Sequence, residues 1–600
     1  MCGIVGFNGH KNGIPKIIKG LESLEYRGYD SAGIAYINNE RITIKKEKGR
    51  IKNLKDLITE KENAYLGIGH TRWATHGEPT KENAHPHQQG KFTLVHNGII
   101  ENYMELQKIL KDKHYAFISQ TDTEVACALI DYYYQKDANI KMAILNASKQ
   151  MRGAFAFGII CEDDKETLYA IRKTSPLIIA KSKDGNFIAS DVPAILEFTN
   201  EYFLLNDLEL AEITKDNITF YNEELKEIKK ESSLFEGNLE ASQKGGYEHF
   251  MLKEIHEQDE IIKNTIACYY DGTIASLDKS FPDLTKFNKI DIVACGSAYH
   301  TGLCAKSFIE NYANIPVNVE VASEYRYKKC FYDKNTLVIL VSQSGETADT
   351  LAALRKAKKD GITTLAIVNV VGSNIAREAD YTLYIKAGCE IAVATTKAYL
   401  AQVAMFSLLA IYLGYKKGLI QEEELIEINK DIKNLPKMIR KTIDNDLYFK
   451  IADQIYENKN IFFIGRGLDY ALCMEGSLKL KEISYINSVA YQAGELKHGT
   501  ISLIEKDTPV IALSTEDELR EKTISNIKEA KSRGAKVIYV TNKIPEEKFY
   551  DEIITIEKIH PILQSILTMI PLQLMSYKVA KNKNCDIDKP RNLAKSVTVE

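Results

Sequence analysis

The second half of the chain carries one sequence pattern twice. Gly296 and Gly467, about 171 residues apart, each follow a β-rich run and are each followed three residues later by a tyrosine. Ser342 recurs in the same way as Ser514. Each copy alternates short β-rich runs with helical stretches, which is typical of a parallel, doubly wound sheet. A repeat of this length predicts two copies of one α/β domain.

The first 235 or so residues have a different pattern. Short β-rich runs lie at 32–37, 92–96, 154–160 and 187–190, with helical patterns near 13–25 and 121–135. This alternation indicates stacked sheets covered by helices. A polar stretch at 222–246, rich in Glu, Lys and Ser, then marks a domain boundary.

Length and composition limit the class of protein. A chain of 600 residues predicts about three or four domains. Its 78 Lys and Arg against 82 Asp and Glu give a net charge of -4, so no basic field favours nucleic acid. The apolar runs are far shorter than the roughly 20 residues of a membrane helix, and no signal-peptide core opens the chain. We expect a cytoplasmic enzyme that acts on small molecules and binds neither nucleic acid nor membrane.

One of the ten cysteines differs from the rest. The ten are scattered without a CxxC pair, which favours free thiols over a disulfide framework or a zinc site. Removal of Met1 would leave the thiol of Cys2 and a free α-amine on one residue. The amine can act as general base for the thiol, directly or through a water. The alternative is a buried cysteine that only begins a strand.

Three later segments carry groups that suit a glutamine substrate. They span 70–77, 96–98 and 121–124, and they contain Arg72, Asn97 beside Gly98, and Asp122. An arginine suits the α-carboxylate and an aspartate the ammonium group. An amide next to a glycine N–H suits the oxyanion of a tetrahedral intermediate.

Together with residues 2–6 (CGIVG) and 26–31 (YRGYDS), these segments resemble the class II, N-terminal-nucleophile glutamine amidotransferases. The resemblance implies an α+β domain of the αββα sandwich type. It also implies that Cys2 is the nucleophile and that Asn97 and Gly98 form the oxyanion hole. The residues that it implies for binding glutamine are Arg72, Trp73, Thr75, His76 and Asp122.

The segment 342–347, SQSGET, lies where a strand is expected to end and a helix to begin. Hydroxyl and backbone N–H groups there can bind a phosphate with help from the helix dipole. The alternative is a serine that only caps the helix. The second copy has Glu516 in this region, whose carboxylate would repel an anion, so we expect phosphate in the first copy alone. The segment and the repeat resemble sugar isomerase (SIS) domains, which handle phosphorylated sugars.

Charged residues of the second copy recur at helical spacing. Glu475, Lys479 and Glu482 fall along one face of a helix. Such a trio is usually solvated, but beside a phosphosugar pocket a carboxylate can move a proton between adjacent sugar carbons. His498 is suited to act on a ring oxygen near neutral pH, unless it is only structural.

The tail at 586–600 contains Lys595. A disordered basic tail is one interpretation, but the segment contains apolar residues and no repeats. A lysine can form a Schiff base with a ketose carbonyl. Spacing alone does not indicate that role.

One amidotransferase domain, two SIS domains and this tail, in this order, resemble the glucosamine-6-phosphate synthase family over essentially the whole chain. The expected bounds are 1–220 for the amidotransferase domain, 221–280 for a linker and lead-in helix, 281–425 and 450–585 for the SIS domains, and 586–600 for the tail. The resemblance implies glutamine-dependent conversion of fructose 6-phosphate to glucosamine 6-phosphate and glutamate, the first step of amino-sugar synthesis. It implies a homodimer, with neither a metal nor an organic cofactor.

The resemblance also implies roles in the sugar half. Lys595 forms the Schiff base, Glu482 moves the proton between C1 and C2, His498 opens the sugar ring and Lys479 assists. The residues implied for binding the sugar phosphate are Ser297, Ser342, Gln343, Ser344, Thr347, Val393 and Ala594.

Two other classes of protein stay open at this point. A related amidohydrolase or deglycase with SIS domains would lack the Lys595 tail. A non-catalytic sugar-phosphate sensor would tolerate loss of Cys2 or Glu482. All three residues are present.

Overall fold

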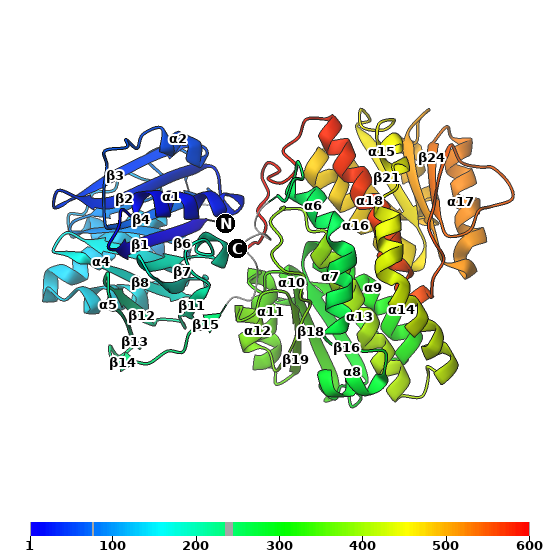
Figure 1. Ribbon diagram of the computed structural model, residues 1–600, viewed down its shortest axis with the longest axis horizontal. Coiled ribbons are helices and arrows are strands. Elements are labelled where there is room, and N and C mark those ends of the chain that lie inside the picture. The colour runs from blue at the N-terminus through cyan, green and yellow to red at the C-terminus, as the bar shows by residue number, and fades with distance from the viewer. Residues whose placement is uncertain (1, 75–76, 235–243, 599–600) are drawn as a thin grey trace. The chain divides into compact units, whose positions relative to one another are not determined.

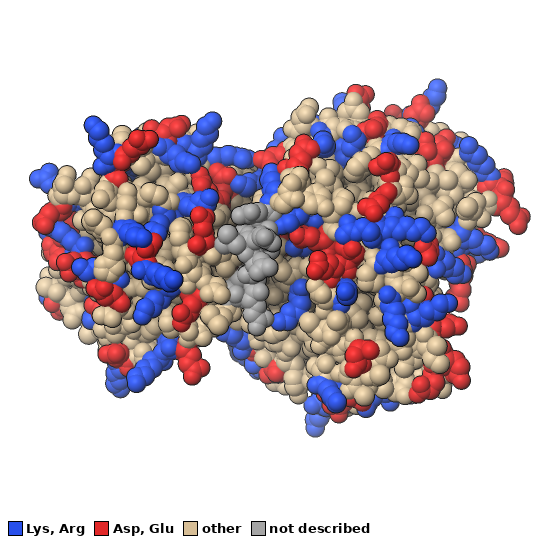
Figure 2. All heavy atoms as spheres, in the orientation of Figure 1, with Lys and Arg blue, Asp and Glu red and all other residues tan. Residues whose placement is uncertain are grey.

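The computed structural model describes residues 2–74, 77–234 and 244–598. The chain forms two compact units, one of Met1–Ser242 with Ala594–Glu600 and one of Gln243–Leu593 (Figure 1). On the face drawn in Figure 2, basic and acidic side chains are interspersed over each unit, in agreement with the nearly balanced charge.

Two antiparallel sheets form the first unit. The larger has the strand order β15 (Ser233–Leu234), β11 (Glu201–Leu204), β9 (Ile178–Ser182), β10 (Gly185–Ala189), β1 (Gly3–Gly9), β4 (Leu66–Arg72), β2 (Ser31–Asn38) and β3 (Arg41–Lys48). The smaller has the order β14 (Glu227–Ile228), β13 (Ile218–Tyr221), β12 (Leu210–Ile213), β8 (Asp164–Lys173), β7 (Gly153–Cys161), β6 (Phe92–Ile100) and β5 (His87–Gln89).

The two sheets stack and are covered by helices on both outer faces. Apolar side chains of both sheets, such as Ile68 on β4 and Val95 on β6, form the core between them. The predicted αββα sandwich is confirmed. The helical segments of this unit are α1 (Ile14–Ser23), η1 (Glu25–Arg27) and α2 (Ile51–Lys55), then α3 (Tyr103–Lys111), α4 (Asp122–Asp137), α5 (Ile140–Gln150) and η2 (Val192–Ala194). Helix α1 packs against β1 and β4 of the larger sheet, and α4 packs against β6 of the smaller.

The second unit contains two five-stranded parallel sheets with the same strand order. The first sheet has the order β17 (Val317–Val321), β16 (Lys289–Ala294), β18 (Thr336–Ser342), β19 (Thr363–Val368) and β20 (Tyr381–Tyr384). The second has the order β22 (Asn487–Gln492), β21 (Asn460–Gly465), β23 (Pro509–Ser514), β24 (Lys536–Thr541) and β25 (Glu552–Thr555). The predicted duplication of one doubly wound domain is confirmed.

Helices lead into, cover and connect these sheets (Figure 1). The segment before the first sheet forms α6 (Phe250–His256), α7 (Gln258–Ala267) and α8 (Ile274–Ser280). Those of the first copy are α9 (Gly296–Ala313), α10 (Ala322–Tyr325), α11 (Ala348–Lys359), α12 (Asn374–Glu378) and α13 (Lys397–Lys416). The remaining ones are α14 (Glu422–Ile443), α15 (Leu447–Ala452), α16 (Gly467–Ser484), α17 (Arg520–Ser532) and α18 (Pro561–Asn582), with the short turns η4 (Glu495–Lys497), η5 (Thr500–Leu503) and η6 (Asp517–Leu519).

Each repeated glycine opens a helix after its strand. Gly296 is the first residue of α9 and Gly467 the first of α16, with φ of 56° and 52°. A left-handed conformation favours glycine at this position, which explains why both copies carry one. The two helices therefore begin at equivalent points beside their sheets.

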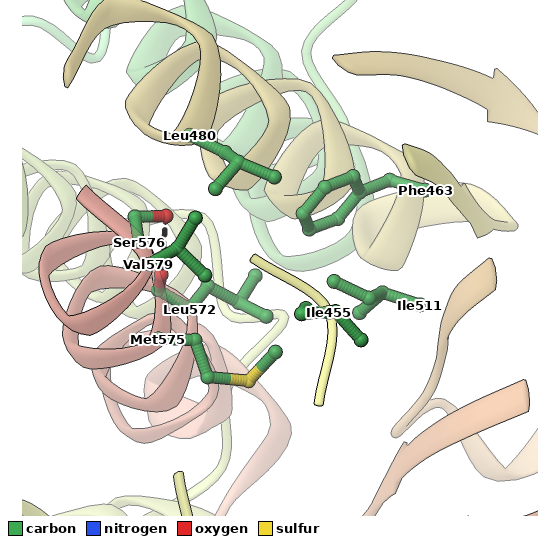
Figure 3. Close-up of a pocket in the computed structure, with 8 residues that line it drawn as sticks. All are labelled: Ile455, Phe463, Leu480, Ile511, Leu572, Met575, Ser576 and Val579. Atoms are coloured by element: carbon green, nitrogen blue, oxygen red, sulfur yellow. Dashed lines mark hydrogen bonds between the residues drawn. The ribbon is translucent and has the colours of Figure 1, made fainter. Parts of the chain in front are cut away.

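Helix α13 has the length and composition of a membrane span, but it is almost wholly buried inside the second unit. A helix that is apolar on all sides can be the central helix of a large core. A small apolar cavity between α16, α18 and the second sheet belongs to the same core (Figure 3). Ser576, on its rim, donates its hydroxyl to the carbonyl of Leu572 at 2.7 Å, so the cavity offers a ligand no polar group from this side chain.

Candidate functional site

Cys2 lies at the start of β1, where the pairing of β1 with β4 brings it beside Trp73. Gly3 pairs with Thr71, and the backbone N–H of Trp73 donates to the Cys2 Sγ at 3.2 Å. Burial raises the pKa of the Cys2 thiol, and this hydrogen bond and the charge of Arg72 oppose the rise only in part. The thiol therefore needs a base to become a nucleophile.

Asn97 and Gly98 reach Cys2 from β6, in the other sheet. The side-chain amide of Asn97 donates from Nδ2 to the backbone oxygen of Cys2 at 2.9 Å. Gly98 has φ of 125°, and a Cβ there would lie 2.0 Å from the backbone oxygen of Ala154. No other residue fits at this position.

A pocket in the first unit brings these residues together with a cation and a carboxylate. Its lining consists of Cys2, Arg72, Trp73, His85, His96, Gly98, Thr121, Asp122 and Thr123. The guanidinium of Arg72 donates to the backbone oxygens of Gly77 and Glu78, each at 3.2 Å. Asp122, the first residue of α4, accepts the N–H of Ile100 at 2.8 Å. A pocket with a fixed cation and a fixed carboxylate suits a zwitterionic amino acid.

The segment after Arg72 is held to the pocket by two contacts. Trp73 packs edge-on against Tyr29 with ring centroids 5.6 Å apart. The N–H of Ala74 donates to Asp30 Oδ2 at 2.9 Å. Thr75 and His76, which the sequence predicts to bind glutamine, lie outside the described residues.

Four buried histidines lie in and behind this pocket. The ring of His85 stacks on that of His70 at 4.2 Å and meets that of His87 edge-on at 5.1 Å. Burial lowers the pKa of His70 to about 3 and the pKa values of His85 and His87 well below their usual value. The Thr123 hydroxyl lies 3.0 Å from His96 Nδ1 and 3.0 Å from His85 Nε2. Within the described residues, no three His, Cys, Asp or Glu side chains are arranged to hold a metal ion.

In the second unit, the SQSGET segment turns from β18 into α11. The Ser342 hydroxyl lies 2.9 Å from that of Thr347 and accepts the N–H of Gly345 at 3.0 Å. The Ser344 hydroxyl accepts the N–H of Glu346 at 3.2 Å. The turn thus gathers three hydroxyls at the N-terminus of a 12-residue helix, an arrangement that suits a phosphate.

A buried cluster of charged side chains joins the two copies. On α16, Lys479 Nζ lies 3.4 Å from Glu475 Oε1 and 2.7 Å from Glu482 Oε2. From α9, Ser297 donates its hydroxyl to Glu475 at 2.8 Å, and His300 Nδ1 lies 2.7 Å from the other carboxylate oxygen. Lys479 also donates to the Ser297 hydroxyl at 3.1 Å.

The charges in this cluster stabilise one another. Burial works against each charge, but the two carboxylates raise the pKa of Lys479 above its ordinary value, and Lys479 with His300 lowers the pKa of Glu475. The side chains of Glu475 and Lys479 are 1% exposed and that of Glu482 is 20% exposed. A solvated helix face is therefore the wrong interpretation of this spacing.

In the second copy, Glu516 stands at the position of Ser344, and its carboxylate lies at the start of α16. Its Oε1 accepts the N–H of Leu468, at the start of α16, at 2.6 Å. Burial and the nearby charge of Asp469 raise the pKa of Glu516 to about 7. Asp469 itself accepts both the N–H and the hydroxyl of Thr515, at 2.7 and 2.6 Å. A carboxylate of the protein thus caps the N-terminus of α16, whose counterpart in the first copy is α9 and not α11.

The other residues expected at the sugar site have contacts and surroundings of their own. The backbone oxygen of Gln343 accepts the N–H of Asn369 at 3.1 Å, and the N–H of Val393 donates to the oxygen of Asp588 at 3.0 Å. His498 lies on an exposed turn after η4. Ala594 and Lys595 group with the first unit.

The structure adds residues that the sequence reasoning left out. They are His70, His85 and Thr123 beside the first pocket, and His300 with Glu475 in the charged cluster. Glu475 fell within the helical spacing of Lys479 but was not assigned to the site. The pair His85 and His87, two residues apart at the start of β5, was the available signal for the buried histidines.

Comparison with known proteins gives consistent matches along the chain. A model of the glutamine amidotransferase domain matches residues 70–197. A model of the SIS domain matches twice, at residues 283–412 and 454–582.

Two full-length relatives carry the same name. A glutamine–fructose-6-phosphate aminotransferase (isomerizing) of Clostridium tetani is 50% identical over 610 residues, which cover 100% of both chains. A protein of the same name from Thermus thermophilus is 41% identical over 608 residues, again 100% of both. The solved C-terminal domain of glucosamine-fructose-6-phosphate aminotransferase from Francisella tularensis has a TM-score of 0.55 and 38% identity, and the match covers 58% of this chain and 100% of that one.

Proposed function

The chain belongs to the glutamine–fructose-6-phosphate aminotransferase (isomerizing) family, and from this premise we propose which of its residues perform each step. It is an enzyme that converts glutamine and fructose 6-phosphate to glutamate and glucosamine 6-phosphate, in amino-sugar synthesis. The observation that best supports the assignment is that one pocket gathers Cys2, Arg72, Gly98 and Asp122 from separate segments of the first unit.

Glutamine is hydrolysed in this pocket. Arg72 binds the α-carboxylate of glutamine and Asp122 the ammonium group, with Trp73, Thr75 and His76 completing the set. The α-amine of Cys2 takes the thiol proton, and Sγ attacks the side-chain amide carbon. The oxyanion accepts hydrogen bonds from Asn97 Nδ2 and the N–H of Gly98. Ammonia leaves, and water then releases glutamate from the thioester.

The sugar phosphate binds in the first SIS copy. The hydroxyls of Ser342, Ser344 and Thr347, with Gln343, bind its phosphate at the start of α11. Further residues assigned to the sugar phosphate are Ser297, Val393 and Ala594. The sequence of the second copy supports binding to one copy alone, because Glu516 stands at the position of Ser344 and its carboxylate would repel a phosphate there.

Amination and isomerisation follow at C1 and C2 of the sugar. His498 opens the sugar ring, and Lys595 condenses with the C2 carbonyl to form an imine and water. Ammonia then displaces the lysine from C2. Glu482 removes a proton from C1 and C2 receives it, which gives the amino-aldose. Lys479 assists by its ion pair with Glu482, 2.7 Å away.

The domain organisation and assembly belong to the same proposal. The amidotransferase domain spans 1–220, the linker and lead-in helix 221–280, the SIS domains 281–425 and 450–585, and the tail 586–600. The protein works as a cytoplasmic homodimer. The exposed position of His498 is compatible with a role in the sugar site of the other protomer. Sedimentation of the purified protein tests the dimer.

Product analysis tests the proposed steps. Purified protein is incubated with glutamine and fructose 6-phosphate, and chromatography identifies the products. We expect glucosamine 6-phosphate and glutamate in equal amounts. Cys2→Ala should stop both products, whereas Lys595→Arg should stop the amino sugar but leave glutamate. Amino sugar from glutamine with Cys2→Ala would overturn the assignment.

A further inference from the structure

His70 is the buried side chain that contacts the side-chain oxygen of Asn97. It lies on β4, opposite Ile4 of β1, and its side chain reaches from the larger sheet to β6 of the smaller one. His70 Nε2 lies 3.1 Å from Asn97 Oδ1 and 2.9 Å from the backbone oxygen of His96. Neither oxygen can donate a hydrogen bond.

The contact with the His96 oxygen determines the tautomer of His70. A backbone oxygen is always an acceptor, so the ring nitrogen that faces it must carry the hydrogen, and the Asn97 atom beside the same nitrogen must then be an acceptor as well. Burial lowers the pKa of His70 to about 3, and the neighbouring His96 and Arg72 add to this effect. The ring is therefore neutral, with its hydrogen on Nε2, throughout the pH range in which such an enzyme works.

The orientation of the Asn97 amide decides whether it can stabilise an oxyanion. An asparagine amide can turn by 180°, which exchanges a donor for an acceptor. In the observed orientation Nδ2 donates to the Cys2 oxygen at 2.9 Å, and Oδ1 faces His70. In the turned orientation an oxygen would face the reacting carbonyl and the NH₂ group would face the N–H of His70, so both contacts would become repulsive.

We propose that His70 is a positioning residue, which holds the Asn97 amide with its NH₂ group toward the nucleophile and so prepares the oxyanion hole before glutamine binds. The inference rests on the proposed role of Asn97. It predicts that the donor on His70 affects the chemical step and leaves the binding of glutamine nearly unchanged, because Arg72 and Asp122 bind the ends of glutamine that His70 does not contact.

Two substitutions separate the donor from the bulk of the ring. His70→Phe keeps an aromatic ring but removes the N–H, whereas His70→Gln places an amide N–H near the position of Nε2. Loss of one oxyanion donor typically costs about 10²–10³ in kcat. Since His70 acts through such a donor, we expect His70→Phe to lower kcat for glutamine hydrolysis about 10–100-fold with KM within about threefold, and His70→Gln to recover most of the loss.

Alkylation of Cys2 gives a readout that does not need the oxyanion hole. Iodoacetamide reacts with a thiolate by displacement at a saturated carbon, so no oxyanion develops. The rate is followed by mass spectrometry of the Cys2 peptide, because the chain has ten cysteines. We expect wild type and His70→Phe to be alkylated at the same rate. If alkylation slows with hydrolysis, His70 acts on the thiol and the proposal is wrong.

The remaining outcomes separate this inference from the proposed function. Asn97→Ala is measured in parallel: if it keeps full hydrolysis, the oxyanion assignment itself is wrong. If Asn97→Ala loses activity and His70→Phe does not, only the positioning role is wrong. A rise in KM with unchanged kcat would also contradict it. Should His70→Phe fail to fold, His70→Asn replaces it, because that amide is too short to reach the position of Nε2.

Discussion

Glu516 gives a stability effect whose pH dependence follows from its place in the fold. Its carboxylate accepts one N–H at the start of α16, which favours the charge, but it lies in a partly buried site beside Asp469. Burial and the charge of Asp469 outweigh the hydrogen bond, since the pKa of Glu516 rises from 4.5 to about 7. A carboxyl group whose pKa is higher in the folded state destabilises the protein as pH rises through this window.

The size of the effect follows from the shift. Complete ionisation in the folded state costs about 3 kcal/mol for a pKa that moves from 4.5 to about 7. Partial exposure of the carboxylate and its coupling to Asp469 reduce this to about 1–2 kcal/mol. Glu516→Gln keeps the acceptor oxygen for Leu468 and removes the charge. We therefore expect the variant to be more stable than wild type at pH 8 and to gain much less at pH 5.

Hydrogen exchange measures the stability of the region around Glu516 by itself. A local measurement is needed because a chain of several domains does not unfold in one step. The peptides of interest cover β21, the start of α16 and β23. At pH 8 their protection in Glu516→Gln should exceed that in wild type by about 5–30-fold, the equivalent of 1–2 kcal/mol. Peptides from β16 and β18 of the first sheet serve as the control and should not change. Equal gains at pH 5 and pH 8, or a loss at pH 8, would refute the reasoning.

Three further predictions concern the reacting groups. Cys2→Ala should abolish glutamine hydrolysis while a thermal shift by fructose 6-phosphate persists, and hydrolysis at the wild-type rate would exclude Cys2 as nucleophile. Ser344→Asp should weaken fructose 6-phosphate binding at least about tenfold by like-charge repulsion, whereas Glu516→Gln should leave it unchanged in the same calorimetric titration; equal losses would contradict a single phosphate site. Glu482→Gln should still form the sugar imine but release little glucosamine 6-phosphate, and product at the wild-type rate would assign the proton transfer to another base.

The sequence predicted those parts of the fold that rest on local patterns. The glycine after each strand and the serine at the end of another recur at nearly constant spacing, and both sheets have the same strand order. The Cys2, Asn97 and Asp122 segments could also be associated from their chemistry. The structure brings residues of these segments into one pocket.

The spacing of the charged residues along the sequence could not show whether they are buried or exposed to solvent. Glu475 and Lys479 at helical intervals look the same on a solvated face and in a core, because burial depends on α9, whose Ser297 lies far away in the sequence. Glu516 was expected to repel an anion. The structure adds that its carboxylate accepts the N–H of Leu468 at the start of α16, a contact that depends on the tertiary fold.

The buried histidines illustrate the same limit. His70 occupies a strand position that pairs with Ile4, and nothing local indicates that its ring crosses to Asn97 in the other sheet. Only the stacking of the two sheets brings them within 3.1 Å.

The covalent step at Lys595 is the most direct test of how the two halves divide the reaction. Borohydride is added to the purified enzyme with fructose 6-phosphate, and the modified peptide is identified by mass spectrometry. An imine at Lys595 would be reduced to a stable sugar adduct on that residue, and Lys595→Arg should prevent trapping because a guanidinium does not form the imine. The account predicts an adduct on Lys595 in wild type and in Glu482→Gln. An adduct on Lys479 instead, or undiminished trapping in Lys595→Arg, would contradict it.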